Sequence, residues 1–319
     1  MKLLFLIVTL LVALASPVLG EENFKEWVKA FKTEALNEGI SSSLLDQAFD
    51  GVAPIPRIIE LDRKQPESKM TFREYRKKIV SKQRIQRGRK MIFQHRDLLK
   101  EIGQQYGVQP RFIVALWGIE TFYGKNSGSY PLIDALATLA FDGRRSQYFR
   151  TELLNAFRIL EEGHTSLGKI KSSWAGAMGQ CQFMPSSFLR LAVDHDGDGR
   201  KDIWHTPADV FASAANYLAQ SGWKGKQIWG RRAQLPVGFN VKLANMKINK
   251  PLSRWQKLGV RKGDGTDLPL APLKGSIILP DGKGGPAYLV YNNYRVIMKW
   301  NRSTYFATSV GLLADALAQ

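Results

Sequence analysis

The stretch of sequence that decides the fold is GVQPRFIVALWGIETFYGKNSGSYPLIDALATLAFDGRR, residues 107–145. Pro110 stands where the first turn of a helix tolerates proline. Apolar residues follow it at helical spacing: Phe112, Ile113, Leu116 and Ile119. Gly124 marks the expected end of this helix, and a second helical pattern covers residues 132–141. We therefore predict two consecutive helices, the first with its apolar face turned toward the core.

Glu120 lies on the apolar face of the first predicted helix, four residues after Leu116 and three after Trp117. A carboxyl group held against apolar side chains resists ionisation, so its pKa rises. A glutamate that stays protonated near neutral pH suits the role of a general acid. The alternative is a structural glutamate that reaches water or pairs with Arg144 or Arg145. The pattern alone leaves both interpretations open.

Residues 1–20 have the composition of a secretory signal peptide, in which Lys2 precedes the apolar run LLFLIVTLLVALA. Cleavage is expected after Gly20. The apolar run is shorter than a comfortable membrane span, which disfavours an uncleaved anchor. No cysteine stands directly after the run to accept a lipid. We therefore expect a periplasmic protein that is soluble after cleavage and carries no membrane anchor.

The formal net charge of +18 favours an acidic polymer or surface as the partner. Nucleic acid and an anionic cell wall both qualify, and an exported protein meets the wall first. The sequence contains no recognisable nucleic-acid-binding motif. The dense basic run at residues 76–89 fits a solvated helix face as well as a specific patch. A wall polymer is therefore the expected partner, and nucleic acid is not.

The remaining patterns predict an α+β chain that is mainly α-helical. Helices are expected in residues 22–50, 91–106 (as one continuous helix), 148–162, 210–218 and 303–318. Residues 52–68 contain three prolines and are expected to form an extended crossing segment. The Gly-rich segment 172–188 carries the single cysteine, Cys181, which excludes an intramolecular disulfide. Short apolar runs at 276–280 and 287–291 indicate a small β-rich region.

The segment DHDGDGRKDIWH, residues 194–205, has the spacing of a calcium-binding loop, with aspartates at positions 1, 3 and 5 and glycine at position 6. His205 replaces the usual bidentate glutamate of position 12. The alternative is a solvated turn, in which the carboxylates would repel one another without compensation. We predict a structural Ca²⁺ whose ligands are the carboxylates of Asp194, Asp196 and Asp198, the carbonyl of Arg200 and, closing the coordination sphere, Asp209.

Taken together, these segments resemble the B-type lytic murein transglycosylases of glycoside hydrolase family 103. The matching motifs, in chain order, are GVQPRFIVALWGIETFYG, LIDALATLAFD followed by RR and YF, SSWAGAMGQCQFMPSSF, the Asp-rich loop ending in DIW, ANYL and WNRSTYFATSV. The resemblance covers essentially the whole chain after the predicted signal peptide, and it is tightest from about residue 106 to residue 223.

The resemblance implies a lysozyme-like α+β core with a helical N-terminal domain, an EF-hand-like calcium loop and a small β-rich domain. The expected boundaries are a signal peptide at 1–20, an N-terminal helical region at 21–72, a catalytic core at 73–223 with its calcium loop at 194–209, a β-rich insertion at 224–294 and a closing helix at 295–319.

The resemblance also implies cleavage of the β-1,4 bond between N-acetylmuramic acid and N-acetylglucosamine in peptidoglycan. The product would be a 1,6-anhydromuramoyl sugar, and no catalytic cofactor would be needed. The family's catalytic glutamate falls on Glu120, which would act first as acid and then as base. The implied substrate-binding residues are Tyr75, Arg145, Ser173, Gln182, Tyr217 and Asn301. Trp300 and Phe306 stand where the family pattern suggests tyrosines, so we expect stacking to persist while a hydroxyl contact is lost.

Three other functions remain open at the level of sequence. A muramidase would cut the same bond with water, a wall-binding protein would keep the fold without catalysis, and a nucleic-acid binder would rest on charge alone. The presence of Glu120 together with Ser173 and Gln182 favours catalysis. Proteins of wall synthesis are further candidate partners.

Overall fold

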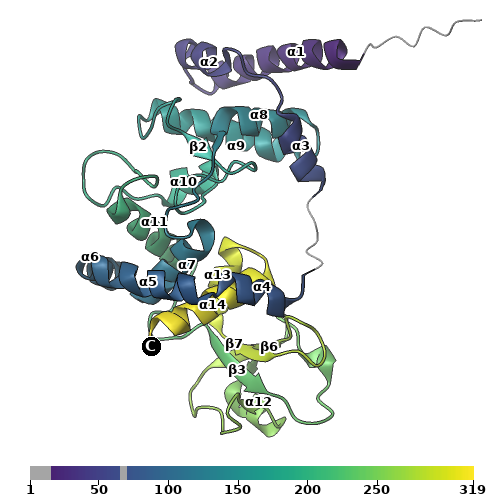
Figure 1. Cartoon of the computed structure of the whole chain (residues 1–319), viewed down its shortest axis with the longest axis vertical. Helices are drawn as coiled ribbons and strands as arrows, with labels where there is room; N and C mark the ends of the chain where they lie inside the picture. The colour runs from purple at the N-terminus through teal and green to yellow at the C-terminus, as the bar shows by residue number, and fades with distance from the viewer. Residues whose placement is uncertain (1–15, 65–69) are drawn as a thin grey trace, which may run out of the picture.

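The structure is a computed structural model that describes residues 16–64 and 70–319. Residues 1–15, most of the predicted signal peptide, lie outside the described residues. Figure 1 shows a mainly helical molecule with a small sheet at one end, as the sequence predicts. Within the described ranges, no helix combines the length and apolar character needed to cross a membrane.

The first helices lie at the end of the molecule opposite the small sheet (Figure 1). They are α1 (Ser16–Asn37), α2 (Ser42–Phe49) and α3 (Pro56–Arg63), and they pack near α8 (Leu132–Phe141) and α9 (Ser146–Glu161). Aromatic rings join these elements, since the Phe31 ring centroid lies 5.7 Å from Phe49 and 6.0 Å from Phe157. Burial of these rings holds the N-terminal helices onto the core.

Two sequence predictions in this part of the chain are wrong. Residues 52–68 were expected to be extended, but Pro56 begins helix α3, because a first helical turn needs no proline N–H. The expected continuous helix at 91–106 is divided at His95 into α5 (Lys82–Gln94) and α6 (Arg96–Tyr106). The His95 backbone is non-helical, and its ring packs edge-on at 5.2 Å from the ring of Phe211. The apolar period runs through this break, so the pattern does not reveal it.

Helix α7 (Pro110–Thr121) lies at the centre of the molecule and contacts α5, α6, α11 and α14. Its residues from 112 to 118 are all buried. The helix ends at Thr121 rather than at Gly124, because Phe122 and Tyr123 already have left-handed φ angles of 52° and 61°. The Tyr123 hydroxyl donates to the carbonyl of Arg84 at 2.7 Å, which ties this strained turn to α5.

The other core helices are α4 (Phe72–Ile79), α10 (Pro185–Leu191), α11 (Pro207–Gln220), α13 (Asn292–Trp300) and α14 (Thr304–Leu317). A capping box between Thr71 and Glu74 starts α4, and the Ser303 side chain caps α14. The predicted helix at 132–141 is confirmed with the same bounds, and those at 148–162, 210–218 and 303–318 are confirmed within three residues. Strands β1 (Tyr130–Pro131) and β2 (Lys171–Ser172) pair antiparallel beside α8.

The small sheet is antiparallel and has the strand order β4-β6-β7-β3-β5. Its elements are β3 (Gly230–Gln234), η1 (Val241–Leu243), β4 (Lys250–Pro251), α12 (Leu252–Lys257), β5 (Arg261–Lys262), β6 (Lys274–Ile278) and β7 (Ala287–Val290). The predicted strands correspond to β6 and β7. Along β7, Leu289 belongs to the core of the small domain, whereas Tyr288 and Val290 belong to the main core. This alternation lets one strand join the two cores.

Candidate active site and calcium loop

Glu120 is the penultimate residue of α7, and its side chain is partly accessible among apolar neighbours. Its Oε1 accepts a hydrogen bond from the indole Nε1 of Trp300 at 2.7 Å. Burial raises the pKa of Glu120 from 4.5 to about 7, and the Trp300 bond opposes that rise. At neutral pH the carboxyl group is therefore divided between its acid and its carboxylate form, so it can both give and take a proton.

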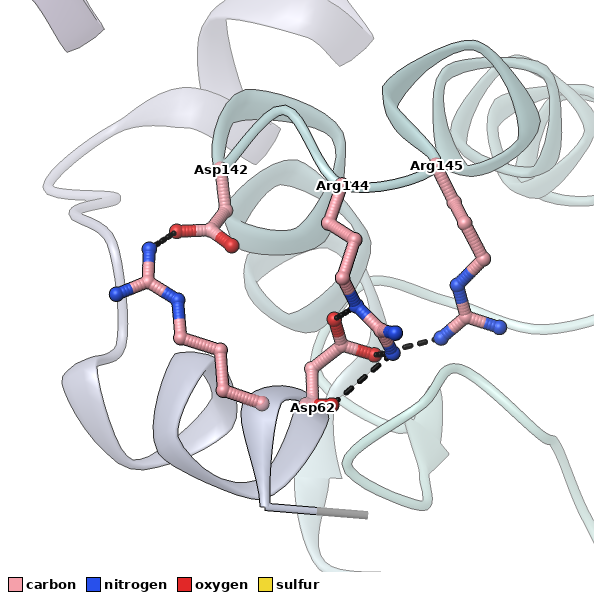
Figure 2. Close-up of polar contacts among 5 residues, drawn as sticks. Asp62, Asp142, Arg144 and Arg145 are labelled. Carbon is pink, nitrogen blue, oxygen red and sulfur yellow. Dashed lines mark hydrogen bonds and ion pairs between the residues drawn. The ribbon is translucent and has the colours of Figure 1, made fainter.

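The alternative ion pair between Glu120 and Arg144 or Arg145 is wrong, because both arginines bind Asp62 (Figure 2). Arg144 donates from Nε to Asp62 Oδ2 at 2.5 Å, and Arg145 donates from Nη2 to Asp62 Oδ1 at 2.6 Å. Asp62 is 1% exposed, and the bond from Arg144, opposed by burial and aided by Arg145, lowers its pKa. The Arg145 guanidinium also lies 4.8 Å from the Phe149 ring centroid. Arg145 thus carries a structural ion pair between α3 and the start of α9.

Trp300 is held in an aromatic cluster beside Glu120. Its ring centroid lies 4.6 Å from that of Tyr217 and 5.3 Å from that of Phe183. The Tyr217 hydroxyl donates to the carbonyl of Lys299 at 2.8 Å, which fixes the last turn of α13. The sequence predicted stacking at Trp300 but not its contact with Glu120. A buried indole N–H needs a polar partner, but nothing in the local sequence identifies that partner.

Tyr75 and Cys181 face the same carboxyl group. Burial raises the pKa of the Tyr75 hydroxyl, and the charge of Glu120 adds to the rise. Burial, with a further contribution from Glu120, also raises the pKa of the Cys181 thiol. The thiol donates to the carbonyl of Val210 at 3.3 Å. Cys181 is therefore a protonated buried thiol, and neither residue competes with Glu120 for a proton near neutral pH.

Ser173 and Gln182 order the Gly-rich segment. The Ser173 Oγ accepts from the backbone N–H of Ala177 at 3.1 Å and of Ala175 at 3.3 Å. Gln182 has a left-handed φ of 51°, and its Nε2 donates to the carbonyls of Gly179 at 3.0 Å and Ser127 at 3.2 Å. Both side chains therefore fix the backbone of the loop that carries them.

Gln180 joins this loop to α7, a role that the sequence does not reveal. Its Oε1 accepts from Trp117 Nε1 at 2.7 Å, and its Nε2 donates to the carbonyl of Trp204 at 2.7 Å. Its own carbonyl accepts from the Thr121 hydroxyl at 3.2 Å. Gly124 lies so close to this side chain that a Cβ atom at that position would come within 2.3 Å of Gln180 Oε1. Gly124 is thus required for close packing and not as the last residue of α7.

Asn301 and Phe306 follow Trp300 and differ in exposure. Asn301 is exposed, and its Oδ1 accepts from the backbone N–H of Ser303 at 2.9 Å. Phe306 is 5% exposed in the first turn of α14. Asn301 therefore shapes the short connection between α13 and α14, whereas Phe306 packs in the core.

The Asp-rich loop gathers three of the predicted ligands. Carboxylate oxygens of Asp194, Asp196 and Asp209 lie within 4.8 Å of one another. Asp209 is fully buried, and it accepts from the backbone N–H groups of His195 and Asp202, each at 2.7 Å. Burial first, and then repulsion from Asp196 and Asp194, raise its pKa. Such a group of hard oxygen ligands suits a divalent cation.

The other two predicted ligands are placed differently. The group of three carboxylates does not include Asp198. Its Oδ1 accepts instead from the backbone N–H of Arg200 at 2.8 Å, and both residues are exposed. The part of the loop from 194 to 200 is otherwise held by Asp194, which accepts from the backbone N–H of Gly197 at 2.8 Å and of Gly199 at 2.9 Å. The loop is thus pre-shaped by its own side chains.

A family model described as the transglycosylase SLT domain matches residues 23–315. The chain is 35% identical over 257 residues to the membrane-bound lytic murein transglycosylase B of Escherichia coli (strain K12). That match covers 76% of this chain and 66% of the relative, so the chain spans about two thirds of the length of the relative.

Two solved structures are also similar to this chain. SltB3 from Pseudomonas aeruginosa, in complex with NAG-anhNAM-pentapeptide, matches with a TM-score of 0.90 and 43% identity, over 92% of this chain and 79% of that chain. The Escherichia coli lytic transglycosylase SLT35 in complex with calcium matches with a TM-score of 0.79 and 30% identity, over 93% of each chain. The predicted resemblance and the lysozyme-like fold are confirmed.

Proposed function

The chain belongs to the transglycosylase SLT domain family, and we propose that it acts on peptidoglycan as a lytic transglycosylase with Glu120 as its only acid/base residue. The observation that carries this proposal is the Glu120 carboxyl group, whose pKa lies at about 7 and which accepts a hydrogen bond from the neutral indole of Trp300. Among the described residues, no lysine or arginine forms an ion pair with it.

Cleavage would begin with protonated Glu120. Its proton goes to the glycosidic oxygen as the bond from that oxygen to C1 of N-acetylmuramic acid breaks, and N-acetylglucosamine leaves with a free hydroxyl. The N-acetyl carbonyl of the muramoyl sugar stabilises the positive charge at C1. The C6 hydroxyl then attacks C1, and its proton returns to the Glu120 carboxylate. No water is consumed, and the product is a 1,6-anhydro sugar.

A single carboxyl group suffices for these reaction steps, whereas most glycosidases use a pair of carboxyl groups. Asp142, a nearby candidate in sequence, is bound to Arg63 at 2.6 Å (Figure 2). Asp134 lies in the first turn of α8, where burial raises its pKa. Within the described ranges, neither aspartate contributes to the shifted pKa of Glu120, which is set by burial and by Trp300. Because Asp142 is engaged by Arg63 and burial favours the neutral form of Asp134, we assign both proton transfers to Glu120.

The saccharide-binding residues that we propose are Tyr75, Arg145, Ser173, Gln182, Tyr217 and Asn301. Tyr75 and Tyr217 support this assignment best, because both border the Glu120–Trp300 pair with half-buried rings on which a sugar can stack. Arg145 supports it least, since one N–H of its guanidinium is already bound to Asp62. Its remaining donors leave room for a carboxylate of the wall peptide.

We further propose that the Asp-rich loop holds a structural Ca²⁺, with no part in the proton transfers. Asp194, Asp196 and Asp209 would provide carboxylate ligands, and Asp198 and the Arg200 carbonyl would join them by a local adjustment of the exposed turn. The raised pKa of buried Asp209 fits this role, because a cation would relieve the repulsion among the carboxylates. Ca²⁺ would supply charge neutralisation and rigidity.

The proposed cellular site is the periplasm. Residues 1–20 would direct export as a signal peptide and would then be cleaved, and we propose no lipid anchor. The net charge of +18 suits a protein that works on an anionic wall. Peptidoglycan strands are the proposed partner, and proteins of wall synthesis are candidates for further contacts.

The decisive experiment is mass spectrometry of the muropeptides that the protein releases from purified peptidoglycan. The parent should release anhydro-muropeptides, and Glu120→Gln should release none. Glu26→Gln, the same substitution at an exposed residue of α1, should behave as the parent. Products that carry an added water would identify a muramidase, and retained binding without release by the parent would identify a wall-binding protein.

A further inference from the structure

We propose that Trp300 is a positioning residue that selects which oxygen of Glu120 carries the transferable proton, an inference that rests on the function proposed above. The indole Nε1 of Trp300 lies 2.7 Å from Glu120 Oε1, and the two residues are 180 positions apart in the chain. The contact therefore joins the end of α7 to the end of α13.

Ring packing and the hydrogen bonds of the neighbouring residue fix the orientation of the Trp300 indole, so that its N–H can orient the Glu120 carboxyl group. Its ring packs against those of Tyr217 and Phe183, which also contact each other with centroids 5.7 Å apart. The preceding residue, Lys299, is held through both its backbone and its side chain. Its carbonyl accepts from the Tyr217 hydroxyl, and its Nζ donates to the carbonyl of Ser221 at 2.9 Å. Both anchoring residues, Tyr217 and Ser221, lie at or just after the end of α11. The N–H direction is thus set by packing and not by Glu120 itself.

The chemistry of indole makes this contact one-sided. An indole N–H donates a hydrogen bond and cannot accept one. Oε1 therefore presents a lone pair to Trp300 whether Glu120 is protonated or ionised. Since the carbonyl oxygen of a neutral carboxylic acid is a stronger acceptor than its hydroxyl oxygen, the contact favours Oε1 as the carbonyl and places the proton on Oε2. A phenol at this place could donate to the carboxylate or accept from the acid, and so would not make the choice.

The other titratable groups that face Glu120 do not select its protonated oxygen in place of Trp300. Tyr75 from α4 and Cys181 from the Gly-rich segment are neutral, because their pKa values are raised. From α11, Tyr217 is bound to a carbonyl. From α5, Arg84 donates to the carbonyls of Gly118, at 3.0 Å, and Ile79.

The remaining elements packed on α7 place their titratable groups elsewhere. His95, between α5 and α6, packs against Trp117, and burial lowers its pKa. Asp315 of α14 pairs with Arg111 at 3.6 Å, at the opposite end of α7. The acidity of Glu120 therefore depends on a balance between burial, which raises its pKa, and the Trp300 N–H, which lowers it.

The test compares the pH profile of Trp300→Phe with that of the parent, with muropeptide release as the assay. Loss of the N–H should raise the pKa of Glu120, since the carboxylate loses its donor, and should move the basic limb of kcat upward by about one unit. The turnover at the optimum should fall about 10- to 100-fold, because the acid is no longer oriented. Trp223→Phe is the matched control, since it removes a bond to Gln109 Oε1 of 3.1 Å and leaves Glu120 untouched.

An unchanged basic limb in folded Trp300→Phe would overturn the proposal. A second measurement avoids any mutation of Trp300. In ¹⁵N-labelled parent protein, the indole N–H resonance of Trp300 should shift as the pH passes through about 7, and it should be insensitive to pH in Glu120→Gln. A resonance that ignores pH in the parent would sink the idea. Turnover by Glu120→Gln would instead overturn the proposed function.

Discussion

The end of α7 and the Asp-rich loop place carboxyl groups in opposite environments. Glu120 lies near the uncharged side chains of Tyr75 and Cys181 and accepts a hydrogen bond from the neutral indole of Trp300. Asp194, Asp196 and Asp209 are gathered within 4.8 Å and are surrounded by backbone N–H groups. In the first region, burial without a countercharge favours the neutral acid. In the second region, the repulsion among close carboxylates favours binding of a cation. The same functional group thus suits proton transfer in one place and, as we propose, cation binding in the other.

Asp62 shows a third environment, in which the charge is satisfied without proton transfer or metal. Two arginines enclose its buried carboxylate, and its pKa is lowered instead of raised (Figure 2). The direction of the pKa shift, together with its cause, separates the three roles. Burial without a countercharge is the feature that distinguishes Glu120.

The strongest test of this comparison is Glu120→Gln. Turnover should fall by about 10³-fold or more, because acid and base catalysis are both lost. The rise of the melting temperature with added Ca²⁺ should be the same as in the parent. Activity measured on purified peptidoglycan and thermal unfolding with and without Ca²⁺ would check both parts. A lost calcium response would mean that the two regions are not independent.

Asp209→Ala should have the reverse effect. It leaves the N–H groups of His195 and Asp202 without their acceptor, which should cost about 2–4 kcal/mol of unfolding free energy. The calcium response should disappear, so that a chelator lowers the melting temperature of the parent but not of the variant. Asp198→Ala, in the exposed part of the loop, provides the milder control. If the chelator leaves the parent unchanged, the structural-calcium proposal fails.

The pH dependence of stability should separate Glu120 from the other carboxylates. Its folded pKa of about 7 exceeds the ordinary value of 4.5, so stability is fully present below about pH 4.5 and is lost as the pH rises through 7. Glu120→Gln removes this loss. The variant should therefore gain up to about 3 kcal/mol over the parent at pH 8 and nothing at pH 4. Urea unfolding at both pH values measures the difference, and an equal gain at both would contradict it.

Asp62→Asn should have the smallest effect. The lowered pKa of Asp62 means that its contribution is present above the unfolded pKa and is lost as the pH falls through the lower folded value. Because both arginines are more than a third exposed, we expect a loss of about 1 kcal/mol near pH 7. Turnover should change less than threefold, as measured on intact peptidoglycan. A much larger loss of turnover would indicate that the pair positions Arg145 for substrate.

The sequence by itself predicted the features that depend on neighbours along the chain. The helical period of residues 110–121 placed Glu120 on an apolar face, and burial then determined its acidity. The spacing of Asp194 and Asp196 on a tight turn likewise brought their carboxylates together. Both are short-range properties, because the geometry of a helix or a turn is the same in any protein.

Only the tertiary structure decided the contacts between distant segments. Trp300 reaches Glu120 across 180 positions, and Gln180 reaches Trp117 across 63. Arg145, which local sequence allowed as a partner of Glu120, is bound to Asp62 across 83 positions. Side-chain hydrogen bonds of this kind depend on which helices pack together, and no local period encodes that packing. The period therefore placed Glu120 on the buried face of α7, and the tertiary fold brought Trp300 from the end of α13 to it as a hydrogen-bond partner.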